Sequence, residues 1–350
     1  MMMFVLILAG FVLLFAGGES LVRGSVGIAR KFGMSELVIG LTLVGFGTSL
    51  PEMVTSLEAL SEGAVGLSIG NVIGSNVANI LLVIGAAALV KSFMTNPRAL
   101  ARDGLFMVAV TIVFAVVVWF DMFTRLTGIM FVLLLLAYLT GSIILDRRAN
   151  SAAGGMHQGE AEEFDADDPV WLSAVLTLAG IIGVIVGAKF LVSGGSDAAR
   201  LFGVSETVIG ISIVAIGTSL PELVTSVMAA RKGKADVALG NVLGSNVFNI
   251  LGILGVSAIV FPFSLIDTSV AEVAGAPLEV AAMTFGEARS LVTWTDMGAI
   301  GLSIFLLGLF AFTGRKLARW EGATLLGAYF LYIGLRFDMI PVISIPGFGG

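Results

Sequence analysis

The chain has 350 residues, of which 57% are hydrophobic and only 13% are charged. Soluble domains of this length carry far more charge, so the composition predicts an all-α polytopic membrane protein embedded in a lipid bilayer. The sequence contains no cysteine, which excludes disulfides and thiol chemistry. The net charge of −6 comes mostly from loops, so we expect no nucleic-acid partner.

Ten apolar segments are long enough to cross a membrane, because a spanning helix needs about 17–25 residues. An acidic stretch rich in glycine and alanine follows the fifth segment and is typical of a flexible linker. Weak calcium binding by its acidic residues is the alternative interpretation. We therefore divide the chain into residues 1–145, the linker 146–169 and residues 170–350. In chain order, the predicted helices are 2–30, 36–60, 65–90, 103–120, 125–145, 170–200, 206–230, 235–261, 296–313 and 321–337.

The two halves repeat one design at a shift of 170 residues. The stretch "ELVIGLTLVGFGTSLPEMVTS" (36–56) aligns with 206–226, and "GNVIGSNVANILLVIG" (70–85) aligns with 240–255 at 11 of 16 identical positions. So sharp a repeat sets the architecture. Each copy holds an odd number of helices, so the second must enter the membrane from the opposite side. We expect two inverted five-helix repeats, as in many secondary transporters.

The loops on one side of this topology carry 13 basic residues and those on the other side carry 4. Basic residues favour the cytoplasm, so we expect both termini outside and the linker 146–169 inside. One connection breaks the symmetry: residues 262–295 are about three times as long as their counterpart 91–102. Within it, 268–290 is a candidate for a short outer helix or flap.

The six letters "GTSLPE" occur at 47–52 and again at 217–222, inside apolar segments. Pro51 has no N–H and clashes with the carbonyl of Gly47, so the helix should open there and free backbone carbonyls. Bare carbonyls at membrane depth are tolerated only around a polar cavity. Glutamate at this depth is functional by default. Carbonyl, hydroxyl and carboxylate oxygens together suit Ca²⁺ and Na⁺.

A second repeated motif lies downstream of each GTSLPE. Asn71, Ser75 and Asn79 are spaced four residues apart and share one helical face. Their counterparts are Asn241, Ser245 and Asn249. If the repeats face each other, these oxygens converge with the two glutamates near the membrane midplane. The structural alternatives are a simple proline kink, interhelical Asn and Ser contacts, and glycine packing.

Glu19 and Lys189 also correspond under the 170-residue shift. They can form a pair, or each can extend to the interface alone; we favour a structural role for both.

Both repeats resemble the α-repeats of the sodium/calcium exchanger family, within the cation/Ca²⁺ antiporter superfamily, and are most similar to its minimal prokaryotic members. The resemblance implies ten helices in inverted repeats with broken helices at the midplane. It implies an antiporter rather than an enzyme, exchanging Ca²⁺ for Na⁺ by alternating access, without a cofactor or an obligate protein partner. It also implies an integral protein of the prokaryotic plasma (inner) membrane.

The same resemblance implies a set of ion ligands. Glu52 and Glu222 would be the central calcium ligands, with the backbone carbonyls of Thr48 and Thr218. Asn79 and Asn249 would complete the centre. The flanking sodium sites would comprise Ser49, Ser75, Ser219 and Ser245, with the carbonyls of Gly45 and Ala215.

Asn249 departs from several relatives, which have aspartate there, and this puts the ion stoichiometry and any role of potassium in question. The GTS letters favour sodium as the coupling ion; proton coupling is the alternative. A cation channel is a further alternative, which a test of uphill transport would separate. An intramembrane hydrolase is disfavoured, because the membrane segments contain no cysteine, no histidine and no matched aspartates.

Overall fold

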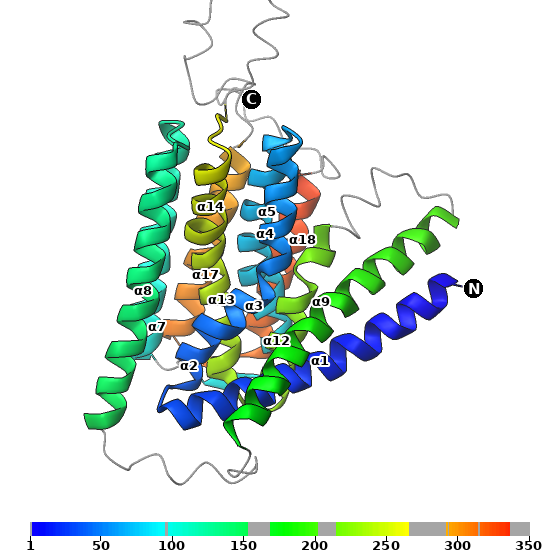
Figure 1. The fold of residues 1–350 in the computed structure, drawn as a ribbon, viewed down its shortest axis with the longest axis vertical. Helices are drawn as coiled ribbons and strands as arrows, with labels where there is room; N and C mark the ends of the chain where they lie inside the picture. Colours follow the sequence, from blue (N-terminus) through cyan, green and yellow to red (C-terminus); the bar gives the residue numbers. More distant parts are fainter. Residues whose placement is uncertain are drawn as a thin grey trace, which may run out of the picture.

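The computed structural model describes residues 2–94, 97–152, 169–201, 215–265, 292, 294–313 and 316–336, and nearly all of them are helical (Figure 1). The first half contains α1 (Met2–Phe32), α2 (Glu36–Ile39), the π-helix η1 (Gly40–Val44), α3 (Gly45–Thr48), α4 (Leu50–Ser61), α5 (Val65–Ala78), the π-helix η2 (Asn79–Ile84), α6 (Gly85–Val90), α7 (Pro97–Trp119) and α8 (Arg125–Ala152). The second half contains α9 (Val170–Leu201), α11 (Ala215–Thr218), α12 (Leu220–Arg231), α13 (Ala235–Phe248), the π-helix η4 (Asn249–Ile253), α14 (Leu254–Val260), α17 (Trp294–Thr313) and α18 (Arg319–Arg336). Two short strands, β1 (Phe93–Met94) and β2 (Lys316–Leu317), pair antiparallel.

Six helices in the described part of the chain are long and apolar enough to cross a membrane. The bent pair Glu36–Thr48 and Leu50–Ser61 makes a seventh candidate. The apolar part of α17, Thr295–Phe310, is shorter than a full span. The expected helix 206–230 is described only from residue 215 onward, and the expected segment 268–290 lies outside the described residues.

Two helices differ from the sequence prediction by more than two residues at one end. Helix α7 begins at Pro97 rather than at 103, because proline is well suited to a first helical turn, where its missing N–H is no loss. Helix α8 continues to Ala152 rather than ending at 145, so the first residues of the expected linker extend the helix. The remainder of that linker, 153–168, lies outside the described residues.

Helices α1 and α9 form a long oblique pair that crosses the side of the bundle (Figure 1). They run antiparallel, since Gly10 meets Leu191 while Gly17 meets Val184. A Cβ added at Gly17 would lie only 2.7 Å from the backbone nitrogen of Val184, so glycine is what allows this close approach.

The helices that carry the repeated asparagine motifs lie at the centre of the bundle. Protein buries 83% of the most apolar stretch of Val65–Val90 and 89% of that of Ala235–Val260. The corresponding share is 33% or less for the spans in α1, α7, α8 and α9. The outer helices instead expose many large apolar side chains, as a lipid-facing surface requires. Most polar side chains of the two asparagine motifs are therefore enclosed by protein, and Asn71 is the one that stays partly exposed.

Candidate ion-binding site

Both GTSLPE motifs break their helices at the serine. Helix α3 ends at Thr48 and α4 begins at Leu50, with a bend of 42° between the two helical pieces. Ser49 and Ser219 have nearly the same backbone conformation, with φ −85° and ψ 3° in one and φ −90° and ψ 5° in the other. The proline that follows each serine lies in the first turn of the next helix, where it needs no hydrogen-bond acceptor. The predicted opening of the helix is confirmed in both copies.

A second irregularity begins at the last asparagine of each second motif. The α-helical pattern changes to a π-helix at Asn79 in one half and at Asn249 in the other. A π-helical turn adds one residue to the loop between hydrogen-bonded groups, and such turns are frequent at functional sites. Each motif asparagine therefore lies where the helix changes its winding.

The two motif glutamates are buried in the middle of the bundle. Glu52 is 1% exposed and Glu222 is fully buried, and the two carboxylates interact electrostatically. The Ser49 hydroxyl donates a hydrogen bond of 3.2 Å to Oε1 of Glu222, which joins the first GTSLPE motif to the second. Both oxygens of Glu52 and Oε2 of Glu222 accept no hydrogen bond. A buried, unpaired charge is costly, so this pair requires cations or protons.

Asparagines from the two halves form reciprocal hydrogen bonds next to the glutamates. Nδ2 of Asn79 donates to Oδ1 of Asn246 at 3.1 Å. Nδ2 of Asn249 donates to Oδ1 of Asn76 at 3.2 Å. The two bonds are related by the 170-residue shift of the repeat. They occupy the amide nitrogens of Asn79 and Asn249 and leave the Oδ1 atoms of both residues unpartnered.

Unpartnered oxygen atoms are concentrated in this centre. In the described part of the chain, eight buried side-chain atoms have no hydrogen-bond partner, and five of them belong to Glu52, Glu222, Asn79 and Asn249. Helix α4, which carries Glu52, packs against η4, while α12, which carries Glu222, packs against η2. Two of these four residues are glutamates. Buried carboxylate and amide oxygens without hydrogen-bond donors are the ligands that hard cations prefer.

A pair of asparagine clamps holds the two glutamate segments. Asn71 donates to the backbone carbonyl of Glu52 at 3.1 Å and to the Ser56 hydroxyl at 2.9 Å. In the second half, Asn241 donates to the carbonyl of Glu222 at 3.4 Å and to the Ser226 hydroxyl at 2.9 Å. Each clamp fixes the first turn of a broken helix against its neighbour.

The remaining predicted ligands lie along the helix breaks. Ser245 donates to the carbonyl of Gly45 at 3.3 Å, so these two predicted sodium ligands are in contact. The Thr48 hydroxyl is 3.1 Å from both the Val44 carbonyl and Oδ1 of Asn241. Ser49, Ser75 and Ser219 are buried. Ala215 and Thr218 begin and end α11, directly before the second break.

Three features were missed by the sequence analysis. Asn76 and Asn246 are the middle letters of "GSNVAN" and "GSNVFN", and the repetition of that letter was the available signal. Of the two alternatives left open for Glu19 and Lys189, a mutual pair is not formed, because Glu19 forms its ion pair with Lys232 at 2.8 Å. That partner lies in a turn that is far from Glu19 in sequence.

The expectation that the membrane segments hold no matched aspartates is wrong. Tyr138 donates to Asp103 at 3.3 Å, and Tyr332 donates to Asp296 at 3.3 Å. Both aspartates are buried near the start of equivalent helices, α7 and α17. The longer connection before α17 shifts this pair out of the 170-residue register, which concealed it. Each carboxylate accepts from its own tyrosine, an arrangement that favours structural support rather than paired acid–base catalysis.

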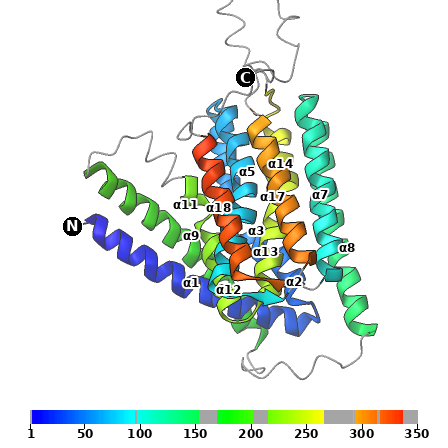
Figure 2. The same ribbon diagram turned by 180° about the vertical axis from the view of Figure 1, so that it is seen from behind.

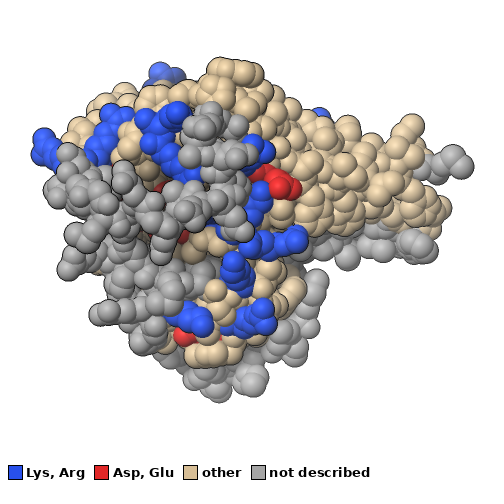
Figure 3. All heavy atoms as spheres, turned by 90° about the horizontal axis from the view of Figure 1, so that it is seen from below, with Lys and Arg blue, Asp and Glu red and all other residues tan. Residues whose placement is uncertain are grey.

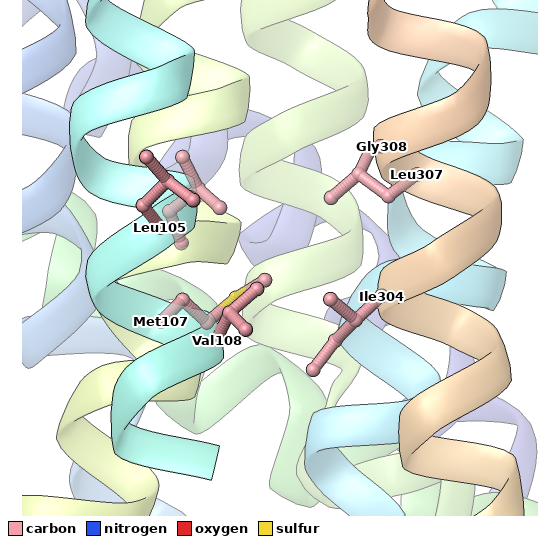
Figure 4. A pocket seen from close by; sticks show the side chains of 8 residues that line it. Leu105, Met107, Val108, Ile304, Leu307 and Gly308 are labelled. Carbon is pink, nitrogen blue, oxygen red and sulfur yellow. The ribbon is translucent and has the colours of Figure 1, made fainter. Parts of the chain in front are cut away.

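A small cavity of about 90 Å³ lies between α7 and α17, and Figure 4 shows the side chains around it. Its lining is apolar and includes Leu105, Val108 and Ile304. A cation would find no ligand there. The cavity is separate from the oxygen-rich centre, and Met107, which lines it, accepts a weak hydrogen bond of 3.6 Å from Asn246.

Basic side chains gather at one end of the molecule, the lower end in Figure 1, as Figure 3 shows from below. Lys232 pairs with Glu19 and Lys234 pairs with Glu36, each at 2.8 Å, and Lys91 reaches the carbonyl of Arg231 at 3.4 Å. Basic residues of loops that were predicted to share one side of the membrane therefore lie at the same end of the structure.

Comparison with known proteins gives the family. The family model described as sodium/calcium exchanger protein matches residues 2–144 and 172–337. The chain belongs to the sodium/calcium exchanger family. It is 34% identical to the putative antiporter CaxA of Alkalimonas amylolytica, over 95% of this chain and 98% of that protein. It is also 34% identical to the sodium/calcium exchanger MaX1 of Methanosarcina acetivorans, with the same coverage of both chains.

A solved structure of the sodium-calcium exchanger NCX_Mj is similar to this exchanger, with a TM-score of 0.76 and 32% identity. The match covers 96% of this chain and 99% of the other. The relatives are antiporters and exchangers, which are transporters rather than enzymes. The predicted family and the predicted class, a membrane antiporter, are thereby confirmed.

Proposed function

We propose that this exchanger moves Ca²⁺ across the membrane in exchange for Na⁺, with Glu52 and Glu222 as the central ligands. The observation that carries this proposal is the set of five unpartnered buried oxygens on Glu52, Glu222, Asn79 and Asn249. They include two carboxylates in a fold that gives them no cationic side chain as a partner within the described residues. The names of MaX1 and NCX_Mj as sodium/calcium exchangers support the choice of ions.

The charges at this centre decide which ion loads are favourable. Ionised Glu52 and Glu222 contribute a formal charge of −2, and Asn79 and Asn249 add none. One Ca²⁺ brings the centre to zero, and so do two Na⁺. A third Na⁺ would leave a charge of +1 that the hydroxyl dipoles of Ser49, Ser75, Ser219 and Ser245 would have to stabilise. An empty centre at −2 is expensive to enclose in a dry protein, so movement should be coupled to ion loading.

Two inverted halves, residues 1–145 and 170–350, would provide the ten membrane crossings. Several observations support this architecture. Helix α4 lies above α3 in Figure 1, whereas α12 lies below α11 in Figure 2. The asparagine bonds between the halves are reciprocal under the repeat shift. The family model matches one segment in each half.

Alternating access would expose the centre first to one side and then to the other. The ion pairs of Lys232 and Lys234 close the basic end of the bundle in this structure, which favours a state sealed at that end. By the positive-inside rule this end faces the cytoplasm, with both termini outside and the stretch 146–169 inside. Exchange driven by ion gradients needs no cofactor.

Uptake of calcium by proteoliposomes tests this function. Vesicles loaded with Na⁺ should accumulate Ca²⁺ against its gradient when external Na⁺ is absent, at a clamped membrane potential. Uptake that follows the Ca²⁺ gradient alone would indicate a channel. Uptake that a pH gradient drives without any response to Na⁺ would assign the coupling to protons.

A further inference from the structure

The ion pair between Glu19 and Lys232 ties the oblique helix α1 to one end of a site helix. Nζ of Lys232 lies 2.8 Å from Oε1 of Glu19, and the lysine side chain is only 18% exposed. Lys232 caps the C-terminus of α12, the helix that carries Glu222 in its first turn. This contact therefore holds the α12–α13 turn against α1 at the basic end of the bundle.

The positions that correspond to Glu19 and Lys232 under the 170-residue shift carry the opposite charges. Glu19 corresponds to Lys189 on α9, and Lys232 corresponds to Glu62 in the α4–α5 turn. Both members change sign, so the second pair is as complementary as the first. The two turns also match in shape, because Gly63 and Gly233 have φ of +76° and +75°.

The second pair is not formed in this structure. Lys189 and Glu62 are both exposed, and no ion pair or hydrogen bond joins either side chain to another residue in the described part of the chain. The α4–α5 turn is at the upper end of the bundle in Figure 1 and the α12–α13 turn is at the lower end in Figure 2. One end of the protein thus has a closed pair, and the other has its separated counterpart.

We propose that Glu19–Lys232 and Glu62–Lys189 are alternating ion-pair latches that close opposite ends of the exchanger in its two states. The inference rests on the proposed antiport by alternating access. In a protein built from two inverted repeats, each repeat can take up the conformation of the other, so a contact present in one state reappears at the shifted positions in the other state. The sign reversal at both shifted positions keeps the reappearing contact attractive.

The neighbouring pair of Lys234 with Glu36 provides a natural contrast. Its shifted positions are Ala64 and Glu206, which cannot form an ion pair. Complementarity after the shift is therefore a property of the Glu19 and Lys232 positions and not of every contact at this end. A partly exposed pair changes the ratio of the two states by about two- to fivefold, which biases each state without trapping it.

Engineered cysteine pairs can test the latches directly, because the chain has no cysteine of its own. The variants are Glu19→Cys/Lys232→Cys, Glu62→Cys/Lys189→Cys and the combination of all four substitutions, each treated with a short bifunctional thiol reagent in vesicles. Each pair should cross-link, each cross-link should stop transport, and in the four-cysteine variant one cross-link should prevent the other. Both cross-links within one molecule, or no Glu62→Cys/Lys189→Cys cross-link under any ion condition, would overturn the proposal.

A charge variant tests whether opening the first latch favours closure of the second. Adding Lys232→Glu to the Glu62→Cys/Lys189→Cys variant should raise its cross-linking about two- to fivefold, because like charges then open the first latch. Adding Glu19→Lys to that protein restores an attractive pair with the charges exchanged; it is the matched control and should return the yield to its starting level. An unchanged yield with Lys232→Glu would contradict the latch. Sodium-driven calcium uptake by the unmodified protein tests the proposed function separately. If the cross-links exclude each other but this uptake is absent, only the assignment of the ions is refuted.

Discussion

Replacing either buried glutamate with glutamine should nearly abolish calcium exchange while leaving the fold intact. Glutamine keeps the shape of Glu52 or Glu222 and removes one charge. Three of the four carboxylate oxygens lack a hydrogen-bond donor, and the amide oxygen of a glutamine at 222 can still accept from Ser49, so the empty protein mainly loses an unfavourable buried charge. The ion-free variants should therefore unfold at the same temperature as the wild type or above it.

The calcium-bound state should respond in the opposite way. With one carboxylate left, bound Ca²⁺ gives the centre a charge of +1 in place of zero. Loss of one member of a buried charge pair costs about 2–5 kcal/mol. This corresponds to calcium binding about 30-fold to several thousandfold weaker. At a Ca²⁺ concentration of about 100 times the wild-type Kd, calcium stabilises the wild type by about 2.7 kcal/mol, and a 30-fold weaker variant by only about 0.9 kcal/mol.

Thermal unfolding in detergent, with and without Ca²⁺, measures this difference, and vesicle uptake measures transport. Glu58→Gln is the matched control, because Glu58 lies on the same helix α4 with its side chain exposed. It should retain both the calcium-dependent stabilisation and the uptake. Full calcium stabilisation of Glu52→Gln, or wild-type uptake by it, would refute the two-glutamate centre.

Three other predictions follow from the site and the topology. Asn241→Ala should lower the free energy of unfolding by about 1–3 kcal/mol, and by more than Asn71→Ala does, because Asn241 is fully buried and also contacts Thr48. Equal unfolding temperatures of the two variants would contradict this. Calcium uptake into sodium-loaded vesicles should be unchanged when choline replaces K⁺, since a centre at −2 is already neutralised by one Ca²⁺; loss of uptake would refute the charge count. An impermeant thiol reagent added outside intact cells should label Arg125→Cys and not Arg148→Cys, both of which are exposed residues of α8, and the reverse pattern would invert the topology.

The sequence was sufficient to predict the helix breaks, and it names most residues of the candidate site. Proline without an N–H, two residues after Ser49 and Ser219, allowed the openings to be predicted from local chemistry alone. The repeat indicated that both halves contribute to one centre. Such features depend on short stretches of chain, so they can be read without knowing the packing.

Features that depend on contacts between distant elements were not predictable in the same way. The choice of Lys232 rather than Lys189 as the partner of Glu19 is decided by how α1 lies against the α12–α13 turn. The reciprocal bonds of Asn76 and Asn246 require the two halves to be assembled. The start of α7 at Pro97 is different, because it follows from a local signal, a proline in the first helical turn, that hydropathy does not report.

The most direct test of the account is the position of the bound cation. Crystals of the exchanger soaked in Sr²⁺, a Ca²⁺ substitute with a strong anomalous signal, should show one peak within about 2.6 Å of carboxylate oxygens of Glu52 and Glu222. The peak should disappear when the soak contains high Na⁺. An Sr²⁺ peak elsewhere in the bundle, with none between these two carboxylates, would contradict the central claim.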